Sequence, residues 1–164
     1  MTSLIETTSY EGVRALVENL VKKHTLGEEI PKEYDAISEE AIETFYSTAY
    51  HFYNNGKYND ALVIFRLLTV LDPMSKRFWM GLAASQQLEK MFGDAMASYG
   101  FAALLDDEDP LPHLHAADCA MNLGNLEEAR EALLCSEMRA LDEELCKHIA
   151  LLKERWFGIN DDNS

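Results

Sequence analysis

The sequence repeats itself with a period of 34 residues. Shifting the chain by this length places alanine on alanine in two series: Ala49, Ala83 and Ala117, and Ala61, Ala95 and Ala129. A bulky residue follows each member of the second series by four positions, as Phe65, Tyr99 and Leu133. A fixed internal period of this length indicates stacked helical units, because one such unit cannot bury its apolar face alone.

The period and the residue pattern resemble the tetratricopeptide repeat, which places bulky, small, aromatic and proline residues at set positions. The three repeats would span residues 42–75, 76–109 and 110–143, with two helices in each. The resemblance implies an all-α fold, with the repeats forming a right-handed superhelical solenoid. Asp72-Pro73 and Asp109-Pro110 are expected to end the second helices of the first two repeats, because proline cannot continue a helix.

Segments on both sides of the repeats are expected to complete the stack. Residues 1–35 predict a helical arm, and its apolar stripe has helical spacing: Val13, Leu16, Val17 and Leu20. Residues 36–158 are assigned to the repeat domain, which begins with Ser38 as a helix N-cap. The domain is expected to end with a capping helix that starts at Asp142 and covers the last repeat. Residues 159–164 predict a flexible tail.

The net charge narrows the classes of partner, and the N-terminus and the cysteines indicate the compartment. The chain has 29 acidic and 14 basic residues, giving a formal net charge of -15. Such a surface repels phosphate backbones and anionic lipids, so we expect neither nucleic acid nor direct membrane binding. The N-terminus lacks a signal-peptide pattern. The odd set of three cysteines, Cys119, Cys135 and Cys146, then predicts reduced thiols in a cytosol.

Sequence motifs for catalysis or cofactor binding are absent. The chain contains no phosphate-binding GxxxxGK[ST], no GxGxxG and no GxSxG pattern. The best metal candidate is HLHAADC, residues 113–119, in which His115 and Cys119 share one helical face. A closed zinc site needs four ligands, and the sequence has no CxxC pair to supply them. We therefore predict a protein that is not an enzyme and has no metal or cofactor.

A row of tyrosines is the most informative feature of the predicted concave surface. Helix positions 2, 5, 9 and 12 of the first repeat place Glu43, Tyr46, Tyr50 and Tyr53 on this surface. The same positions of the second repeat add Arg77, Met80, Ala84 and Gln87. Tyrosine offers flat apolar area with a hydroxyl at the tip, which suits a bound peptide. The alternative is that the tyrosines pack under the N-terminal arm.

The residues at the concave positions argue against one known type of ligand for these repeats, an acidic peptide tail. In some proteins that contain these repeats, a carboxylate clamp binds the acidic tails of chaperones. The clamp consists of lysine, asparagine and arginine residues at fixed repeat positions. This chain has none of them: the positions hold Tyr46, Tyr50, Gly81, Leu111 and His115. A net charge of -15 also disfavours an acidic tail as the ligand.

The strings ETFYSTAYHFYNNGKYNDALVIFRLLTVLDP, RFWMGLAASQQ, AMASYGFAALLD and HLHAADCAMNLGNLEEA, within residues 35–140, are more specific than the repeat pattern. They resemble class II chaperones of bacterial type III secretion, the SycD/LcrH/IpgC group. The resemblance implies a chaperone of the bacterial cytoplasm that holds two hydrophobic secreted translocators before export. Each client would present an extended PxLxxP-like segment, which its prolines keep extended.

The resemblance also implies which residues act. The candidates for the peptide-binding groove are Tyr46, Tyr50, Tyr53, Leu67, Leu71, Met80, Ala84 and Tyr99. Leu67 and Leu71 could instead serve packing between repeats. The resemblance further implies a homodimer formed through the arm, for which the stripe Val13, Leu16, Val17 and Leu20 is the candidate. The alternative function is a generic tetratricopeptide scaffold or co-chaperone that binds another folded protein.

Overall fold

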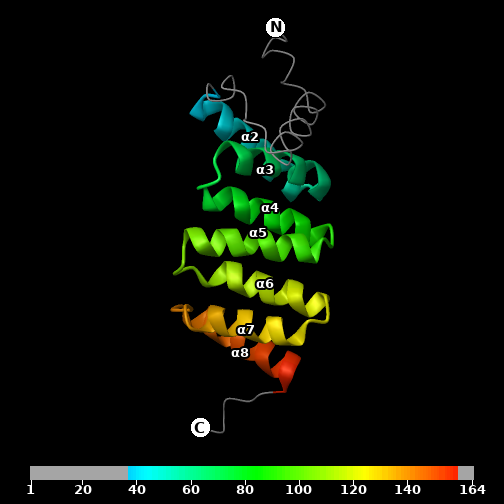
Figure 1. Cartoon of the computed structure of the whole chain (residues 1–164), viewed down its shortest axis with the longest axis vertical. Helices are drawn as coiled ribbons and strands as arrows, with labels where there is room; N and C mark the ends of the chain where they lie inside the picture. Colours follow the sequence, from blue (N-terminus) through cyan, green and yellow to red (C-terminus); the bar gives the residue numbers. More distant parts are fainter. Residues whose placement is uncertain (1–36, 159–164) are drawn as a thin grey trace, which may run out of the picture. The chain divides into compact units, whose positions relative to one another are not determined.

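The computed structural model describes residues 37–158, and all regular structure in this range is helical. The helices are α2 (Glu39–Asn54), α3 (Tyr58–Leu71), α4 (Lys76–Leu88), α5 (Phe92–Leu105), α6 (Pro110–Asn122), α7 (Leu126–Glu137) and α8 (Glu143–Phe157), as Figure 1 shows. The pairs α2–α3, α4–α5 and α6–α7 correspond to the three predicted repeats. The all-α tetratricopeptide-repeat fold is therefore confirmed. The arm and its stripe Val13, Leu16, Val17 and Leu20 lie outside the described residues.

The repeated alanines are fully buried positions of the helices. All six, Ala49, Ala61, Ala83, Ala95, Ala117 and Ala129, are 0% exposed. A methyl group is the largest side chain that these positions accept without pushing neighbouring helices apart, since protein interiors pack at nearly crystalline density. The period of the sequence thus marks positions that are buried in the helices.

Side-chain capping explains several of the helix starts. Ser38 accepts a hydrogen bond from the Ala41 amide at 3.2 Å, and Asp142 accepts one from the Leu145 amide at 2.8 Å. Both N-caps are as predicted. The role predicted for Asp109-Pro110 is wrong, because α5 has already ended at Leu105. Asp109 instead caps α6 by accepting from the Leu111 amide, and Pro110 is the first residue of α6, where its missing N–H is harmless.

The turns inside the repeats need a left-handed residue. Gly56 and Gly124 occupy this conformation in the first and third repeats, with φ of 73° and 75°. In the second repeat Lys90 stands there, with φ of 61°. A side chain in this region is strained, so the second repeat keeps its turn at some cost in stability.

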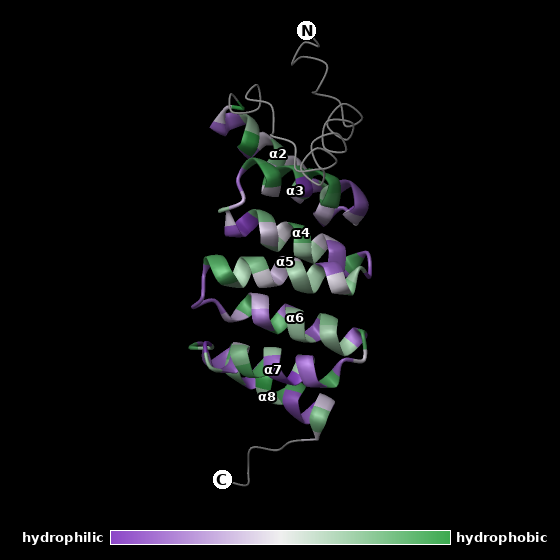
Figure 2. Cartoon of the chain, in the orientation of Figure 1, coloured by the Kyte–Doolittle hydropathy of each residue, from purple (hydrophilic) through white to green (hydrophobic). Residues whose placement is uncertain are grey.

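The chain divides into two compact units, Met1–Glu89 and Lys90–Ser164. The boundary falls at the turn between α4 and α5, inside the second repeat. In the first unit α3 packs against both α2 and α4, and its core contains Ile64, Phe65, Leu68 and Phe78. In the second unit α6 packs against α5 and α7, and most of α5 is coloured as hydrophobic in Figure 2.

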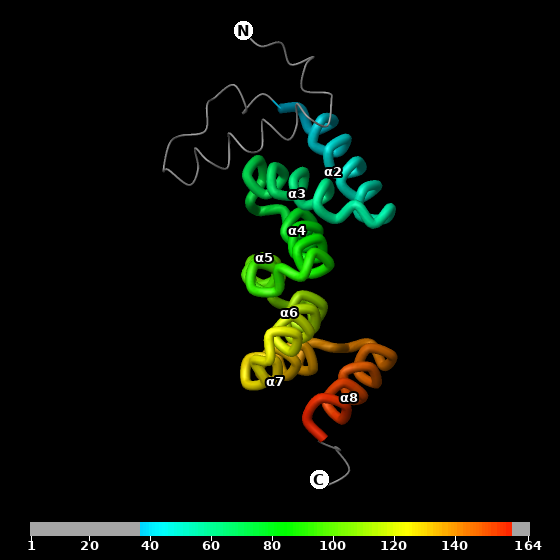
Figure 3. Tube along the Cα trace, turned by 90° about the vertical axis from the view of Figure 1, so that its right-hand side faces the viewer, coloured from blue at the N-terminus to red at the C-terminus, as the bar shows by residue number. Residues whose placement is uncertain are grey.

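Helix α8 covers the end of the second unit, as predicted for a capping helix (Figure 3). Ile149 lies in a buried cluster with Leu114 and Ala117 of α6 and Leu133 of α7. Further α8 side chains pack around this cluster: Leu145, Leu152, Trp156 and Phe157. Lys153 of α8 pairs with Glu137 of α7 at 2.9 Å, which ties the two helices together at the edge of the cluster.

Candidate functional site

Aromatic side chains form a continuous series along α2 in the first unit. Ring centroids lie 5.8 Å apart from Phe78 to Tyr46, 6.0 Å from Tyr46 to Tyr50, 6.3 Å from Tyr50 to Tyr53 and 5.5 Å from Tyr53 to Tyr58. We call these five residues the aromatic ladder. Spacings of four and three residues place the α2 members on one face of the helix, so the local helix alone brings the three tyrosines together.

Tyr46 of the ladder packs against the core, whereas Tyr50 in the middle of the ladder is exposed to solvent. The ring of Tyr46 meets the buried ring of Phe65 edge-on, with centroids 6.1 Å apart. Tyr50 is 51% exposed. Burial raises the pKa of both Tyr46 and Tyr53. The ordinary pKa of tyrosine already lies far above neutral pH, so both hydroxyl groups are protonated and can donate hydrogen bonds. The ladder therefore presents apolar ring faces and hydroxyl donors to a ligand, and the buried core supports the rings.

Arg77 and Glu43 form a charged pair at the Phe78 end of the ladder. The guanidinium of Arg77 lies 4.6 Å from the ring centroid of Tyr46 and 4.9 Å from that of Phe78. Arg77 also donates from both terminal nitrogens to the carboxylate of Glu43 on α2, and the bond from Nη1 to Oε2 is 3.2 Å. This hydrogen bonding lowers the pKa of Glu43. Glu43 and Arg77 are 34 residues apart and occupy the same position in consecutive repeats.

The other predicted groove residues of the first unit have different degrees of burial. Met80 and Ala84 on α4 and Leu71 on α3 are half-buried and retain accessible surface. Leu67 is 0% exposed and belongs to the core. In this structure Leu67 presents no surface to a peptide, in agreement with the packing role considered as its alternative.

Tyr99 lies in the second unit and does not join the ladder. It is 1% exposed, and its ring stacks on His115 with centroids 5.3 Å apart. Its position four residues after the repeat alanine Ala95 is the core position that Phe65 occupies in the first repeat. Tyr99 therefore fills a core position, and it also contributes to the lining of a hollow of about 640 Å³ on the second unit.

The surroundings of Cys119 and His115, the residues considered for metal binding, do not favour a metal site. Cys119 is buried, and desolvation raises the pKa of its thiol to about 12, which opposes the thiolate that a metal requires. Burial lowers the pKa of His115, whose ring packs on Tyr99. Within residues 37–158, no three histidine, cysteine or carboxylate side chains are grouped as metal ligands. The helices described here include none that is long and apolar enough to cross a membrane.

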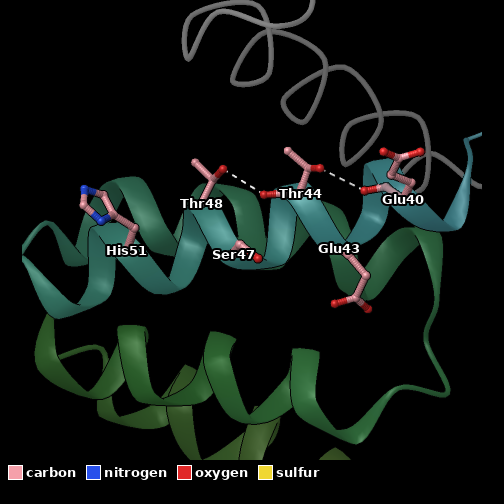
Figure 4. A pocket seen from close by; sticks show the side chains of 6 residues that line it. All are labelled: Glu40, Glu43, Thr44, Ser47, Thr48 and His51. Carbon is pink, nitrogen blue, oxygen red and sulfur yellow. Dashed lines mark hydrogen bonds between the residues drawn. The ribbon is translucent and has the colours of Figure 1, made fainter.

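A different side of α2 is polar (Figure 4). A shallow hollow of about 460 Å³ is lined by Glu40, Glu43, Thr44, Ser47, Thr48 and His51. Thr44 and Thr48 donate to the backbone carbonyls of Glu40 and Thr44 at 2.9 and 2.8 Å, as the dashed lines show. Because these hydroxyl donors are used within the helix, the aromatic ladder is the better candidate for a binding surface.

Sequence reasoning missed the two ends of the ladder. Phe78 and Tyr58 were not among the predicted groove residues: Phe78 is buried near the start of α4, and Tyr58 is the first residue of α3. Glu43 and Arg77 were placed on the concave surface without a predicted interaction. Their shared repeat position was the available signal, because equivalent positions in consecutive repeats lie side by side.

The helix pairs and the aromatic ladder, which is exposed at Tyr50, define a tetratricopeptide-repeat protein with an aromatic surface. The family model for the tetratricopeptide repeat matches residues 40–74 and 78–109. The chain is 35% identical over 114 residues to the low calcium response locus protein H of Yersinia pestis, an alignment that covers 70% of this chain and 68% of the relative. The chain therefore belongs to the low calcium response protein H family.

Solved structures of translocator chaperones agree with this assignment. SycD, the type III secretion translocator chaperone of Yersinia enterocolitica, superposes with a TM-score of 0.69 at 31% identity, covering 77% of this chain and 98% of SycD. PcrH in complex with the chaperone binding region of PopD gives a TM-score of 0.71 at 29% identity, covering 75% of this chain and 96% of PcrH. A second SycD structure is described as an alternative dimer, with a TM-score of 0.64 at 32% identity over 73% of this chain and 98% of SycD.

Proposed function

We propose that this chain is a chaperone of type III secretion translocators, which it holds in the bacterial cytoplasm before export. The observation that carries the proposal is the aromatic ladder on α2, open at Tyr50 and supported from below by Phe65. The related PcrH forms a complex with the chaperone binding region of a translocator, PopD. An extended PxLxxP-like segment of the client would lie along the ladder, with Met80, Ala84 and Leu71 on the neighbouring helices.

The energetics suit a client that must later be released. A short apolar segment buries a few side chains at roughly 25 cal/mol per Å². Its proline residues reduce the ordering cost of binding. An affinity in the micromolar range, about 8 kcal/mol, protects the segment in the cytoplasm and still allows it to dissociate. No chemical step is required of the chaperone.

Tyr50→Ala tests the proposed site with little risk to the fold, because this ring is half exposed. We expect it to weaken binding of a synthetic PxLxxP peptide about tenfold, since aromatic anchors dominate peptide interfaces. Tyr50→Phe keeps the ring and should bind within about twofold of the parent. Isothermal titration calorimetry measures both, and circular dichroism verifies that both variants are folded.

Equal peptide affinity of Tyr50→Ala and the parent chain would contradict the site. Co-expression with a full-length hydrophobic translocator extends the test: the parent should keep the client soluble and the Tyr50→Ala variant should not. If the chain captured the acidic tail of a heat-shock chaperone and no translocator, the alternative function of a scaffold or co-chaperone would be supported instead.

We also propose that the chain forms a homodimer through the apolar stripe Val13, Leu16, Val17 and Leu20. The stripe has helical spacing, and the related SycD has been described as a dimer. Leu16→Asp should shift the chain from dimer to monomer in light scattering coupled to size exclusion, because an unpaired charge in an apolar interface is strongly unfavourable. The surface variant Leu151→Asp on α8 is the control and should remain dimeric.

A further inference from the structure

The guanidinium of Arg77 is held in a fixed plane at the end of the aromatic ladder. Its distances to the ring centroids of Tyr46 and Phe78 are 4.6 and 4.9 Å, so the aromatic rings support it from the protein side. Glu43 fixes its orientation through hydrogen bonds to both terminal nitrogens. The Arg77 side chain is nevertheless 45% exposed. It is thus positioned in advance and accessible to a ligand.

Glu43 does not exhaust the donors of Arg77. A guanidinium carries five N–H donors in a planar fork. Glu43 accepts one hydrogen bond from Nη1 and one from Nη2, and it therefore occupies the end of the fork. The side of the fork, formed by Nε and one terminal nitrogen, can pair with a second carboxylate in bidentate geometry. A carboxylate that pairs with this side does not have to displace Glu43.

We propose that Arg77 is a specificity-determining residue, which selects client segments that carry an acidic side chain next to their apolar anchors. The inference rests on the proposed function and names a chemical requirement for the client. The chain as a whole has a net charge of -15 and repels acidic partners at long range. A single carboxylate at Arg77 is attracted only once the segment is seated on the ladder. The preference therefore also sets the direction in which the segment lies.

Peptide binding by the full-length chain tests the inference. The parent peptide is Gly-Ser-Pro-Ala-Leu-Ala-Ala-Pro-Ser-Gly, and each of its alanines is replaced in turn by Glu, Gln or Lys. At one position at least, the Glu peptide should bind about fivefold tighter than the Gln peptide, a magnitude typical of an exposed charged hydrogen bond in good geometry. The Lys peptide should bind more weakly than either, and added salt should reduce the difference.

Variants of the chain assign the preference to Arg77. Arg77→Gln should abolish the Glu-over-Gln preference, and Arg77→Lys should retain only part of it, because lysine keeps the charge without the planar fork. Lys76→Gln removes the same charge one residue away and should leave the preference intact. Circular dichroism shows whether each variant is folded. A preference that survived in Arg77→Gln, or that fell equally in Lys76→Gln, would overturn the assignment.

The outcomes separate this inference from the proposed function. If the parent peptide binds and its affinity falls in Tyr50→Ala, but Glu and Gln peptides bind equally at every position, only the role of Arg77 is wrong. If neither the parent peptide nor any substituted peptide binds, the ladder is not the client site and both proposals fail.

Discussion

Gly81→Ala is expected to destabilise the first unit by about 1–3 kcal/mol, as overpacking of a filled core does. Glycine-to-alanine changes inside helices are normally stabilising by up to about 1 kcal/mol. Here an added Cβ would overlap the Phe65 ring at Cε1 and Cζ and would lie 2.6 Å from Cδ1. Phe65 is 1% exposed and cannot move aside without displacing its neighbours. Urea unfolding followed by circular dichroism measures the change.

Gly100→Ala is the matched control, because Gly100 also lies within a helix and an added Cβ there meets nothing within 4 Å. It should raise stability by about 0.5–1 kcal/mol. Gly81→Ala should also weaken binding of the PxLxxP peptide, since Phe65 supports Tyr46 at the base of the ladder. Unchanged stability of Gly81→Ala would show that the Phe65 ring is not confined as described.

Ile149→Ala is expected to destabilise the second unit by about 2–5 kcal/mol, the range for truncating a buried aliphatic side chain. Ile149 is 1% exposed in the cluster that joins α8 to α6 and α7. Removing its distal carbons leaves a cavity beneath the capping helix and uncovers the last repeat. Thermal and urea unfolding should both report the loss.

Leu151→Ala provides the control on the same helix, because Leu151 is 63% exposed. Its effect should stay within about 0.5 kcal/mol. Under conditions where Ile149→Ala is still folded, its affinity for the peptide should match that of the parent, because the ladder belongs to the first unit. A strong loss of peptide affinity in folded Ile149→Ala would contradict a site confined to α2 and its neighbours.

The contrast between Tyr50 and Tyr99 shows how far residue type and position predict a site. Both are tyrosines within repeat helices, and both were predicted to line the groove. Tyr50 is half exposed, whereas Tyr99 fills the core position of its repeat and stacks on His115. The equivalence of Tyr99 to Phe65 was visible in the sequence. A resemblance between families transfers residue positions more reliably than it transfers the burial of a particular side chain.

The chain's repeat period, its six buried alanines and the N-caps Ser38 and Asp142 could be predicted without coordinates, because each follows from spacing or from local hydrogen bonding. The clustering of Tyr46, Tyr50 and Tyr53 could also be predicted, since one helix face brings them together. The ends of the ladder depended on tertiary structure: Phe78 joins Tyr46 only because α4 packs beside α2. The stacking of Arg77 on Tyr46 and its pairing with Glu43, 34 positions away, likewise require α2 and α4 together. Such contacts arise from packing between helices, which residue spacing alone does not specify.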